Sequence, residues 1–363
     1  MSHIGVAIVG TGFGATVHIP GFRENNRTKV VALYHRNLEK ARSLALKYEV
    51  QNYFDQLEEL LALETVDAVA LSTPPFLHYE MAKQIMLSGK HLLLEKPLTM
   101  TFAECQHLYR IAQSQGVIVA VDFMFRTIPA WQLLEKYLNQ GYIGKPRFIK
   151  VDWLVPGRAD PLRPWNWYSS KEQGGGALGA LGSHVFDYLH WLFGPASSIS
   201  AQLYSSIKER IDPLDGLKKV VDADDIATIS LQLGDQVPAQ VNLSSSTYQG
   251  RGHWLEIYGD QGTLVLGSSN LKDYVHGFQL MGSSKGAELK KIDIPKELDF
   301  KNVFADGRIA PFARVVDIWA TAIDSKKQPV PSLAEGLYCQ LLMDLAHQSN
   351  EQRKSLEIPS TWL

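Results

Sequence analysis

Residues 6–15 read Val-Ala-Ile-Val-Gly-Thr-Gly-Phe-Gly-Ala, an apolar run that leads directly into a glycine-rich turn. The run predicts a short buried strand. Gly10 allows a tight turn, Gly12 lets the backbone approach a pyrophosphate, and the small Ala15 allows a helix to pack closely on the strand. The amino end of that helix then holds the phosphates. The residues expected to bind a dinucleotide here are Gly10, Gly12, Phe13, Gly14 and Ala15.

The first third of the chain, to about Asp122, alternates short apolar runs with amphipathic stretches. This alternation is typical of a parallel sheet covered by helices, and hence of an α/β fold. Gly89 and Gly116 are expected to end two of the helices. The expected strands are 4–9, 29–34, 67–72, 91–94 and 117–121, and the expected helices include 38–48, 77–88 and 102–114.

After Asp122 the pattern changes to strand-like runs joined by turns such as 259–262, which predicts a mostly antiparallel sheet. Segment 156–175 is long, aromatic and poorly periodic, so we expect a functional loop there. The expected strands are 147–155, 198–205, 227–233, 239–243, 254–258 and 263–266, and the expected helices are 128–139, 313–325 and 333–349.

The composition indicates a soluble enzyme. A chain of 363 residues suggests two domains of ordinary size. The net charge is −2 and the charges are scattered, so no basic stripe favours nucleic acid, and Lys290-Lys291 is interpreted as a solvated strand edge. Cys105 and Cys339 are too few for a disulfide scaffold or a zinc site, so we expect reduced buried thiols, a cytoplasmic location and no metal. No stretch approaches the roughly 20 apolar residues of a membrane span.

A lysine follows the apolar run 91–94, in Glu95-Lys96-Pro97. At the carboxyl end of a strand in an open α/β sheet, its side chain would point into the crevice where such sheets bind ligands. There an ammonium group would stabilise the alkoxide that develops when a hydroxyl loses its proton. A surface salt bridge is the alternative, and we favour catalysis for Lys96.

Four motifs in order resemble the glucose-fructose oxidoreductase, inositol dehydrogenase and MocA family. They are Gly10 to Ala15, Ser72-Thr73-Pro74-Pro75 with Leu77-His78 and Glu80, Glu95-Lys96-Pro97-Leu98-Thr99, and Gly174 to Leu178 continuing to Gly182-Ser183-His184 and Asp187. The resemblance implies NAD(P)-dependent hydride transfer, a doubly wound Rossmann domain over residues 1–122, and a substrate-binding α/β domain over residues 123–363 whose closing helices can pack back on the first. It also implies a large open-faced sheet that serves as the contact of a homodimer or homotetramer.

The second motif is expected to follow the third principal strand, where Ser72, Thr73, Pro74 and Pro75 would shape the floor under the nicotinamide. A plain strand-to-helix turn is the alternative. His78 is expected to cap or pack at the helix start, close to the cofactor. Glu95 and Lys96 complete the cofactor-contacting set that the resemblance implies.

His184 is the second catalytic candidate, since a histidine titrates near neutral pH and can exchange a proton with a substrate oxygen. It shares a helical face with Tyr188 and Trp191, and ordinary core packing of that face is the alternative. The family pattern commonly has an aspartate four positions earlier, where this chain has Ala180. An alanine can neither relay a proton nor orient an imidazole. The candidates to replace that aspartate are Tyr168, Asp160 and Asp187.

Several aromatic residues lie in and near the long loop and are expected to bind the faces of a ring-shaped substrate, with core packing as the alternative. The expected substrate-binding residues are Trp153, Arg163, Trp165, Trp167, Tyr168 and His184. A short acidic cluster lacks a calcium-loop pattern and is interpreted as a solvated turn. It consists of Asp222, Asp224 and Asp225.

The second strand ends in Tyr34-His35-Arg36-Asn37, without the acidic residue that would hold the ribose hydroxyls of NAD. His35 and Arg36 are expected to contact the cofactor, and Arg36 is suited to pair with the 2′-phosphate of NADP. An exposed arginine at a helix start is the alternative. NADP is therefore the expected cofactor and NAD the alternative.

Three functions fit these observations. The first is an NAD(P)-dependent oxidoreductase acting on a carbonyl or hydroxyl of a small sugar, polyol or cyclic compound. The second is a reductase of a conjugated substrate, as in the biliverdin reductases, which resemble this family and need less acid-base machinery. The third is a catalytically silent dinucleotide-binding sensor, which would tolerate Ala180.

Overall fold

The computed structural model describes residues 3–362, which form two compact units. The first unit takes in the chain up to Met124 together with Asn302–Gln340. The second takes in Phe125–Lys301 and Leu341–Trp362. Within the described residues, none of the helices combines the length and the apolar character that crossing a membrane requires.

A six-stranded parallel sheet forms the centre of the first unit, with the strand order β3-β2-β1-β4-β5-β6. The order reverses between β1 and β4, which pair directly, and in such sheets the reversal marks the ligand crevice at the carboxyl ends of the strands. This confirms the predicted doubly wound fold. The strands are β1 (Ile4–Val9), β2 (Thr28–Tyr34), β3 (Asn52–Phe54), β4 (Ala68–Leu71), β5 (His91–Leu94) and β6 (Val119–Val121).

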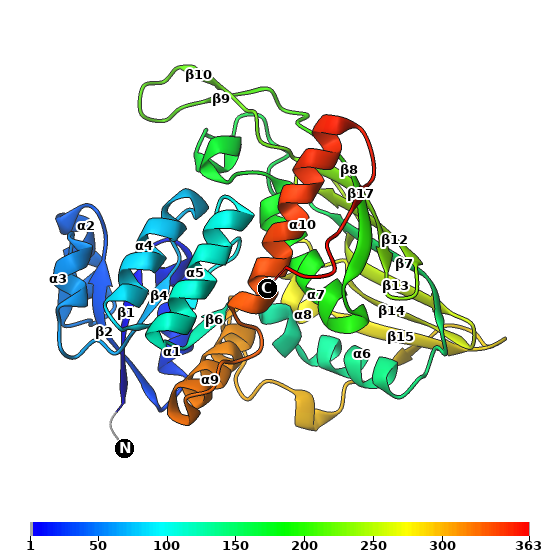
Figure 1. Cartoon of the computed structure of the whole chain (residues 1–363), viewed down its shortest axis with the longest axis horizontal. Coiled ribbons are helices and arrows are strands. Elements are labelled where there is room, and N and C mark those ends of the chain that lie inside the picture. Colours follow the sequence, from blue (N-terminus) through cyan, green and yellow to red (C-terminus); the bar gives the residue numbers. More distant parts are fainter. Residues whose placement is uncertain (1–2, 363) are drawn as a thin grey trace. The chain divides into compact units, whose positions relative to one another are not determined.

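Helices cover this sheet, and Figure 1 shows α4 (Pro75–Leu87) and α5 (Phe102–Gln115) lying side by side over it. Helix α5 begins with a capping box, in which Thr101 accepts from the Glu104 backbone, and it ends at Gly116, whose φ is 65°. The other helical segments of this unit are η1 (Gly14–His18, a π-helical turn), α1 (Ile19–Arg23), α2 (Leu38–Lys47), α3 (Leu57–Leu61), α9 (Ile309–Ser325) and the first part of α10 (Leu333–Gln352).

The second unit is built on a nine-stranded sheet in the order β16-β15-β14-β13-β7-β12-β11-β8-β17. Only the β7–β12 pair is parallel among these described strands, so the predicted mostly antiparallel sheet is confirmed. The strands are β7 (Pro146–Leu154), β8 (Ala196–Tyr204), β11 (Ile226–Leu233), β12 (Val237–Ser244), β13 (Gly252–Gly259), β14 (Gly262–Ser268), β15 (Gln279–Ser284), β16 (Lys290–Ile292) and β17 (Leu356–Glu357).

Burial alternates along some strands of this sheet, as in β11, where Ala227, Ile229 and Leu231 are buried and Ser230 and Gln232 are exposed. Such alternation belongs to a sheet with one covered and one open face. Helical segments of the same unit are α6 (Pro129–Asn139), α7 (Ser183–Phe193), α8 (Tyr274–Gly277), the π-helical η5 (Leu178–Gly182) and the 3-10 turns η2 (Met124–Thr127), η3 (Trp167–Ser169), η4 (Lys171–Gln173) and η6 (Lys296–Leu298). A separate hairpin joins β9 (Glu209–Ile211) to β10 (Lys218–Val220).

The interpretation of the acidic cluster as a solvated turn is wrong for two of its three members. Asp224 is buried, and its carboxylate accepts a 2.8 Å hydrogen bond from the Leu178 backbone. Burial raises the pKa of Asp224 to about 6. Asp225 is also buried and accepts hydrogen bonds from Ser206, whereas Asp222 is exposed. The two buried carboxylates therefore organise loops instead of facing water.

Candidate active site

The glycine-rich turn packs tightly against the end of β4. Gly10 has a φ of 108°, and a β-carbon there would lie 2.6 Å from the Ser72 carbonyl. A β-carbon at Gly14 would lie 2.6 Å from Ser72 Oγ and 3.0 Å from Ile8. Gly14 is thus the position where the helix comes closest to the sheet, a role that the sequence assigned to Ala15, which is buried beside it.

Gly12 has a different environment, because no described atom lies within 4 Å of the position its β-carbon would take. Packing inside the chain therefore gives no reason for a glycine there. The space above the turn suits the close approach of a phosphate, and the helical run from Gly14 to Arg23 begins just beyond it. The residues present fit a bound dinucleotide.

His78 connects the loops that follow β4 and β5. Its Nε2 lies 2.7 Å from the Thr73 carbonyl oxygen and its Nδ1 lies 3.0 Å from that of Pro97. Burial lowers the pKa of His78 to about 4, although hydrogen bonds to these carbonyl oxygens raise it. A neutral ring carries one N–H and donates it to one of the two carbonyls. His78 thereby fixes the segments that carry Ser72 to Pro75 and Lys96. Pro74 and Pro75 start α4, with Pro75 at its first turn.

Ionisable side chains gather where β5 and β6 end. Glu95 and Lys96 follow β5, and Asp122 follows β6. Glu95 and Asp122 are buried, and Lys96 is half-buried. Burial lowers the pKa of Lys96, whereas the nearby Glu95 and Asp122 carboxyl groups raise it. This is the chemistry expected of a lysine that exchanges a proton more readily than an exposed one.

His18 joins this group from the helical segment after the glycine turn. Its Nε2 lies 2.9 Å from Glu95 Oε1, and its ring stacks on Phe312 of α9 at 4.2 Å between centroids. The ring is fully buried, and burial lowers its pKa to about 4. The sequence reasoning missed His18 and Asp122. Asking which residue follows every strand of the parallel sheet would have found Asp122, but His18 has no such signal.

The end of β2 presents the predicted basic segment. His35 Nδ1 accepts from the Asn37 backbone at 3.0 Å, and Asn37 in turn caps α2 by accepting from the Lys40 backbone at 2.9 Å. Arg36 between them is exposed. The loop is thus ordered by its neighbours while the guanidinium faces solvent.

In the second unit, His184 lies in the first turn of α7 and is buried in an aromatic cluster. Its ring meets Phe125 edge-on at 4.8 Å and lies 6.1 Å from Trp153. Trp153 stacks on His253 with ring centroids 4.0 Å apart. Trp153 is therefore a buried neighbour of His184, with one face covered by His253.

Ala180 lies in the π-helical turn that leads into α7 and is half-buried. Such turns often occur at functional sites. Of the proposed replacements for an aspartate here, Asp187 is buried in a salt bridge with Arg126 at 2.6 Å, and Asp160 is exposed and accepts from the Leu162 backbone. Their carboxylates therefore have partners elsewhere.

The remaining loop aromatics pack in two places. Trp165 donates its indole N–H to the Val220 carbonyl of the β9–β10 hairpin at 3.1 Å. Trp167 contacts Tyr168 at 4.4 Å, and the Arg158 guanidinium lies 4.0 Å from the centre of the Tyr168 ring. Arg163 is exposed and donates to the Gly157 carbonyl at 2.7 Å.

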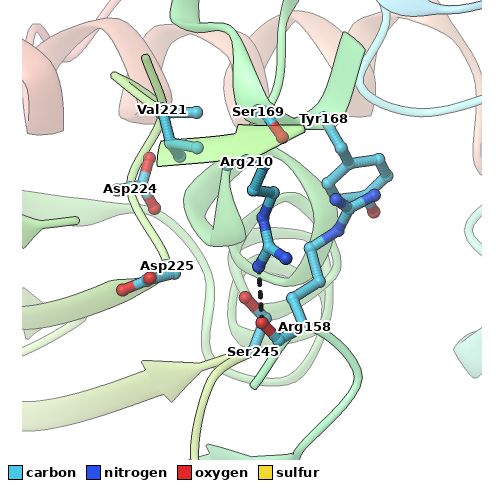
Figure 2. Close-up of a pocket in the computed structure, with 10 residues that line it drawn as sticks. Arg158, Tyr168, Ser169, Arg210, Val221, Asp224, Asp225 and Ser245 are labelled. Carbon is cyan, nitrogen blue, oxygen red and sulfur yellow. Dashed lines mark hydrogen bonds between the residues drawn. The ribbon is translucent and has the colours of Figure 1, made fainter. Parts of the chain in front are cut away.

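Arg210, which the sequence reasoning also missed, fixes this loop through hydrogen bonds to its backbone. Figure 2 shows it beside Arg158 and Tyr168 at a small pocket. Its guanidinium donates to the backbone carbonyls of Arg158, Asp160 and Arg163 at 2.7 to 3.2 Å. These contacts order the loop 156–175, and Tyr168 contacts both Trp167 and Arg158.

Comparison with known proteins agrees with this architecture. A family model described as "Oxidoreductase family, NAD-binding Rossmann fold" matches residues 4–123, and one described as "Oxidoreductase family, C-terminal alpha/beta domain" matches residues 135–358. An oxidoreductase of Synechocystis sp. is 53% identical over 98% of this chain and 96% of its own length. Levoglucosan dehydrogenase of Pseudarthrobacter phenanthrenivorans is 28% identical over 73% of this chain and 74% of its own length.

Solved structures show the same fold. An oxidoreductase domain protein from Kribbella flavida has a TM-score of 0.89 and 26% identity, over 99% of this chain and 100% of the other. A levoglucosan dehydrogenase complexed with NADH has a TM-score of 0.88 and 23% identity over the same shares. The chain therefore belongs to the glucose-fructose oxidoreductase, inositol dehydrogenase and MocA (Gfo/Idh/MocA) family and is an NAD(P)-dependent oxidoreductase.

Proposed function

We propose that the enzyme interconverts a hydroxyl and a carbonyl group on a small sugar, polyol or cyclic compound. The observation that carries this proposal is the position of Lys96. It follows the carboxyl end of β5 and lies within a buried group of ionisable side chains. The sheet that holds it reverses its strand order between β1 and β4. The relatives support the substrate class, since they include levoglucosan dehydrogenase, D-xylose dehydrogenase and D-glucoside 3-dehydrogenase. The nicotinamide, when bound, accepts or supplies the hydride.

Lys96 stabilises the substrate oxygen as its proton leaves, through charge and a hydrogen bond. His184 exchanges a proton with the substrate oxygen, and Tyr168 is the candidate that supplies what Ala180 lacks, since it carries a hydroxyl and is held in place by Arg158. Trp153, Arg163, Trp165 and Trp167 contribute to recognition of the substrate.

The cofactor is proposed to be NADP, with NAD as the alternative. The glycine turn would hold the pyrophosphate, and Ser72 to Pro75 would contact the nicotinamide. Arg36 would pair with the 2′-phosphate, since it is exposed at the end of β2 and the loop offers no acidic group for a ribose hydroxyl. The family model and the levoglucosan dehydrogenase complexes name NAD or NADH, which is why both cofactors belong in the test.

Residues 1–122 are proposed to serve as the cofactor domain and residues 123–363 as the substrate and oligomerisation domain of a cytoplasmic homo-oligomer. The open face of the nine-stranded sheet is the proposed contact between subunits. This face carries the exposed Phe148 and a hollow of about 240 Å³, and the hollow is lined by hydroxyl and amide groups such as Ser200, Ser230 and Gln240.

The decisive experiment measures nicotinamide absorbance for the purified enzyme with NADP or NAD and a panel of sugars, cyclitols and their keto forms, beside Lys96→Ala. We expect turnover of a hydroxyl or keto compound that the variant lacks. Turnover only of compounds with a conjugated double bond would favour the reductase alternative. Cofactor binding without turnover of any compound would favour the silent alternative.

A further inference from the structure

Three buried side chains surround one point beside Lys96 in the first unit. Each comes from a different segment: His18 from the helical run after the glycine turn, Glu95 from the end of β5, and Asp122 from the end of β6. The closest ring nitrogen and carboxylate oxygens of the three lie within 4.8 Å of one another. This arrangement places two buried carboxyl groups close together, so their protonation has to be explained.

The geometry limits where the protons can be. Glu95 and Asp122 are both buried and bring carboxylate oxygens within 4.8 Å of each other, and two negative charges this close favour a proton on one of them. His18 Nδ1 is buried without a partner among the described atoms, so the N–H of the neutral ring belongs on Nε2, which faces Glu95 Oε1. Glu95 also accepts from the Lys96 backbone at 3.3 Å. Glu95 thus accepts from the His18 ring and from the Lys96 backbone.

Asp122 is then the member that carries the proton. Its Oδ1 is buried and has no hydrogen-bond partner among the described atoms. A carbonyl-type oxygen of a neutral acid tolerates this better than an oxygen of an ionised carboxylate, whose desolvation is far more costly. Burial and the charge of Glu95 raise the pKa of Asp122 well above its usual value, in agreement with this assignment.

Counting charges leads to the same assignment. The charged groups that face the pair are Lys96 and Arg308, and His18 is neutral. Arg308 is paired with Asp306 through two hydrogen bonds of 2.8 and 2.6 Å. One anion on Glu95 therefore balances Lys96, whereas an ionised Asp122 would add a second buried negative charge.

We propose that Asp122 is a neutral carboxylic acid that makes Glu95 the single anionic partner of Lys96, so that Asp122 and His18 are positioning residues for that lysine. The link to catalysis rests on the proposed function of Lys96, but the protonation state of Asp122 does not. An amide at position 122 can replace the acid O–H with an N–H donor of the same shape. The Glu95→Gln change, in contrast, removes the anion.

The first test measures thermal unfolding of Asp122→Asn and wild type from pH 5 to pH 8. A carboxyl group whose pKa is higher in the folded state binds a proton on folding, so wild-type stability falls as pH rises from the unfolded pKa to the folded one. The amide does not titrate. Between those two pKa values, the unfolding constant of wild type divided by that of Asp122→Asn should therefore rise about tenfold per pH unit. The variant thus gains stability relative to wild type as the pH rises.

Asp67→Asn is the matched control, since the Asp67 carboxylate accepts a single backbone hydrogen bond from Gly5 at 2.7 Å in the same sheet. Its stability difference from wild type should stay flat over this range. A flat difference for Asp122→Asn as well would overturn the proposal. Should Asp122→Asn fail to fold, infrared spectra of wild type labelled with ¹³C-aspartate decide instead: a protonated carboxyl band at pH 7 is expected, and its absence overturns the assignment.

The second test follows the pH profile of kcat/KM at saturating cofactor. Glu95→Gln should move the limb that reports Lys96 to lower pH by at least one unit, because the anion that favours its charged form is gone. Asp122→Asn should keep the wild-type position of that limb. A shift in Asp122→Asn equal to that in Glu95→Gln would mean that Asp122 is ionised and would overturn the proposal.

Two further outcomes distinguish a failure of the proposed function from a failure of the proton assignment. If neither variant moves the limb while the infrared band is present, Asp122 is neutral but the proposed function of Lys96 is wrong, and with it the positioning role. If elemental analysis finds one divalent metal per chain that Asp122→Asn loses, the three side chains are metal ligands and the proton assignment is overturned.

Discussion

Gly14 and Ser72 approach so closely that a β-carbon on Gly14 would lie 2.6 Å from Ser72 Oγ. This contact brings the first helical turn against the end of β4, where the strand order of the sheet reverses. The glycines of the turn are therefore unequal: Gly10 and Gly14 are required by the chain itself, and Gly12 is not. We therefore assign Gly10 and Gly14 to folding and Gly12 to cofactor binding.

Gly14→Ala should lower the free energy of unfolding by about 1–3 kcal/mol, because the new methyl group must displace Ser72 or Ile8. Gly12→Ala should change that free energy by no more than about 0.5 kcal/mol, because its methyl group meets open space. It should nevertheless weaken cofactor binding at least about tenfold, since the methyl group would occupy the approach of the pyrophosphate. Denaturant unfolding and cofactor titration measure the two effects. Equal cofactor affinity in Gly12→Ala and wild type would contradict the assigned position of the pyrophosphate.

Lys96→Ala should lower kcat by about 10² to 10⁴ because a positioned charge and proton donor is lost. The affinity for cofactor should stay within a few-fold of wild type, as the lysine is proposed to act on the substrate oxygen. Steady-state kinetics and fluorescence titration check the two parts. Wild-type kcat in the variant would remove Lys96 from the mechanism.

Arg36→Ala should weaken NADP binding by about tenfold or more and leave NAD binding unchanged, because a charge-assisted pair with the 2′-phosphate is lost. Arg42→Ala is the matched control, since Arg42 is an exposed arginine further along α2. It should bind both cofactors like wild type. Tighter binding of NAD than of NADP by wild type, unaffected by Arg36→Ala, would exclude the proposed preference.

Ala180→Asp should fold, since Ala180 is half-buried, and should move the histidine-dependent limb of the pH-rate profile to higher pH. The reason is that a carboxylate near an imidazole favours its protonated form and so raises its pKa. Ala180→Asn has the same size without the charge and should leave the limb in place. His184→Ala should lower activity. If Ala180→Asp unfolds the chain, the position is packed core; if none of these changes alters turnover while Lys96→Ala does, His184 is structural and conjugate reduction becomes the better account.

The parallel sheet was largely predictable because its strands are continuous apolar runs: the expected 4–9 and 91–94 coincide with β1 and β5. The short edge strand β3, whose residues are partly exposed, carries no such pattern and was missed. Strands β15 and β16 were not among the expected strands for the same reason. The interpretation of Lys290-Lys291 as a solvated strand edge is nevertheless confirmed, because both residues are exposed in β16. The expected burial of Cys105 and Cys339 is also confirmed.

The site was predictable only where function depends on residues adjacent along the chain. Lys96 follows a strand, so the carboxyl-end rule finds it. The contact of His18 with Glu95 joins residues 77 positions apart and depends on how a π-helical turn rotates one side chain. Similarly, the burial of Asp224 comes from the Leu178 backbone, 46 positions away. Such pairings are decided by tertiary packing, which local patterns do not encode.

The first unit is discontinuous along the chain, because α9 returns to it after every strand of the large sheet except β17. Phe312 of α9 stacks on His18, and Trp319 donates its indole N–H to the Ile118 carbonyl. All six strands of the parallel sheet precede Met124, whereas the contacts of Phe312 and Trp319 with this unit can form only after α9 has been synthesised. During synthesis the sheet is therefore complete well before the helix that packs against His18.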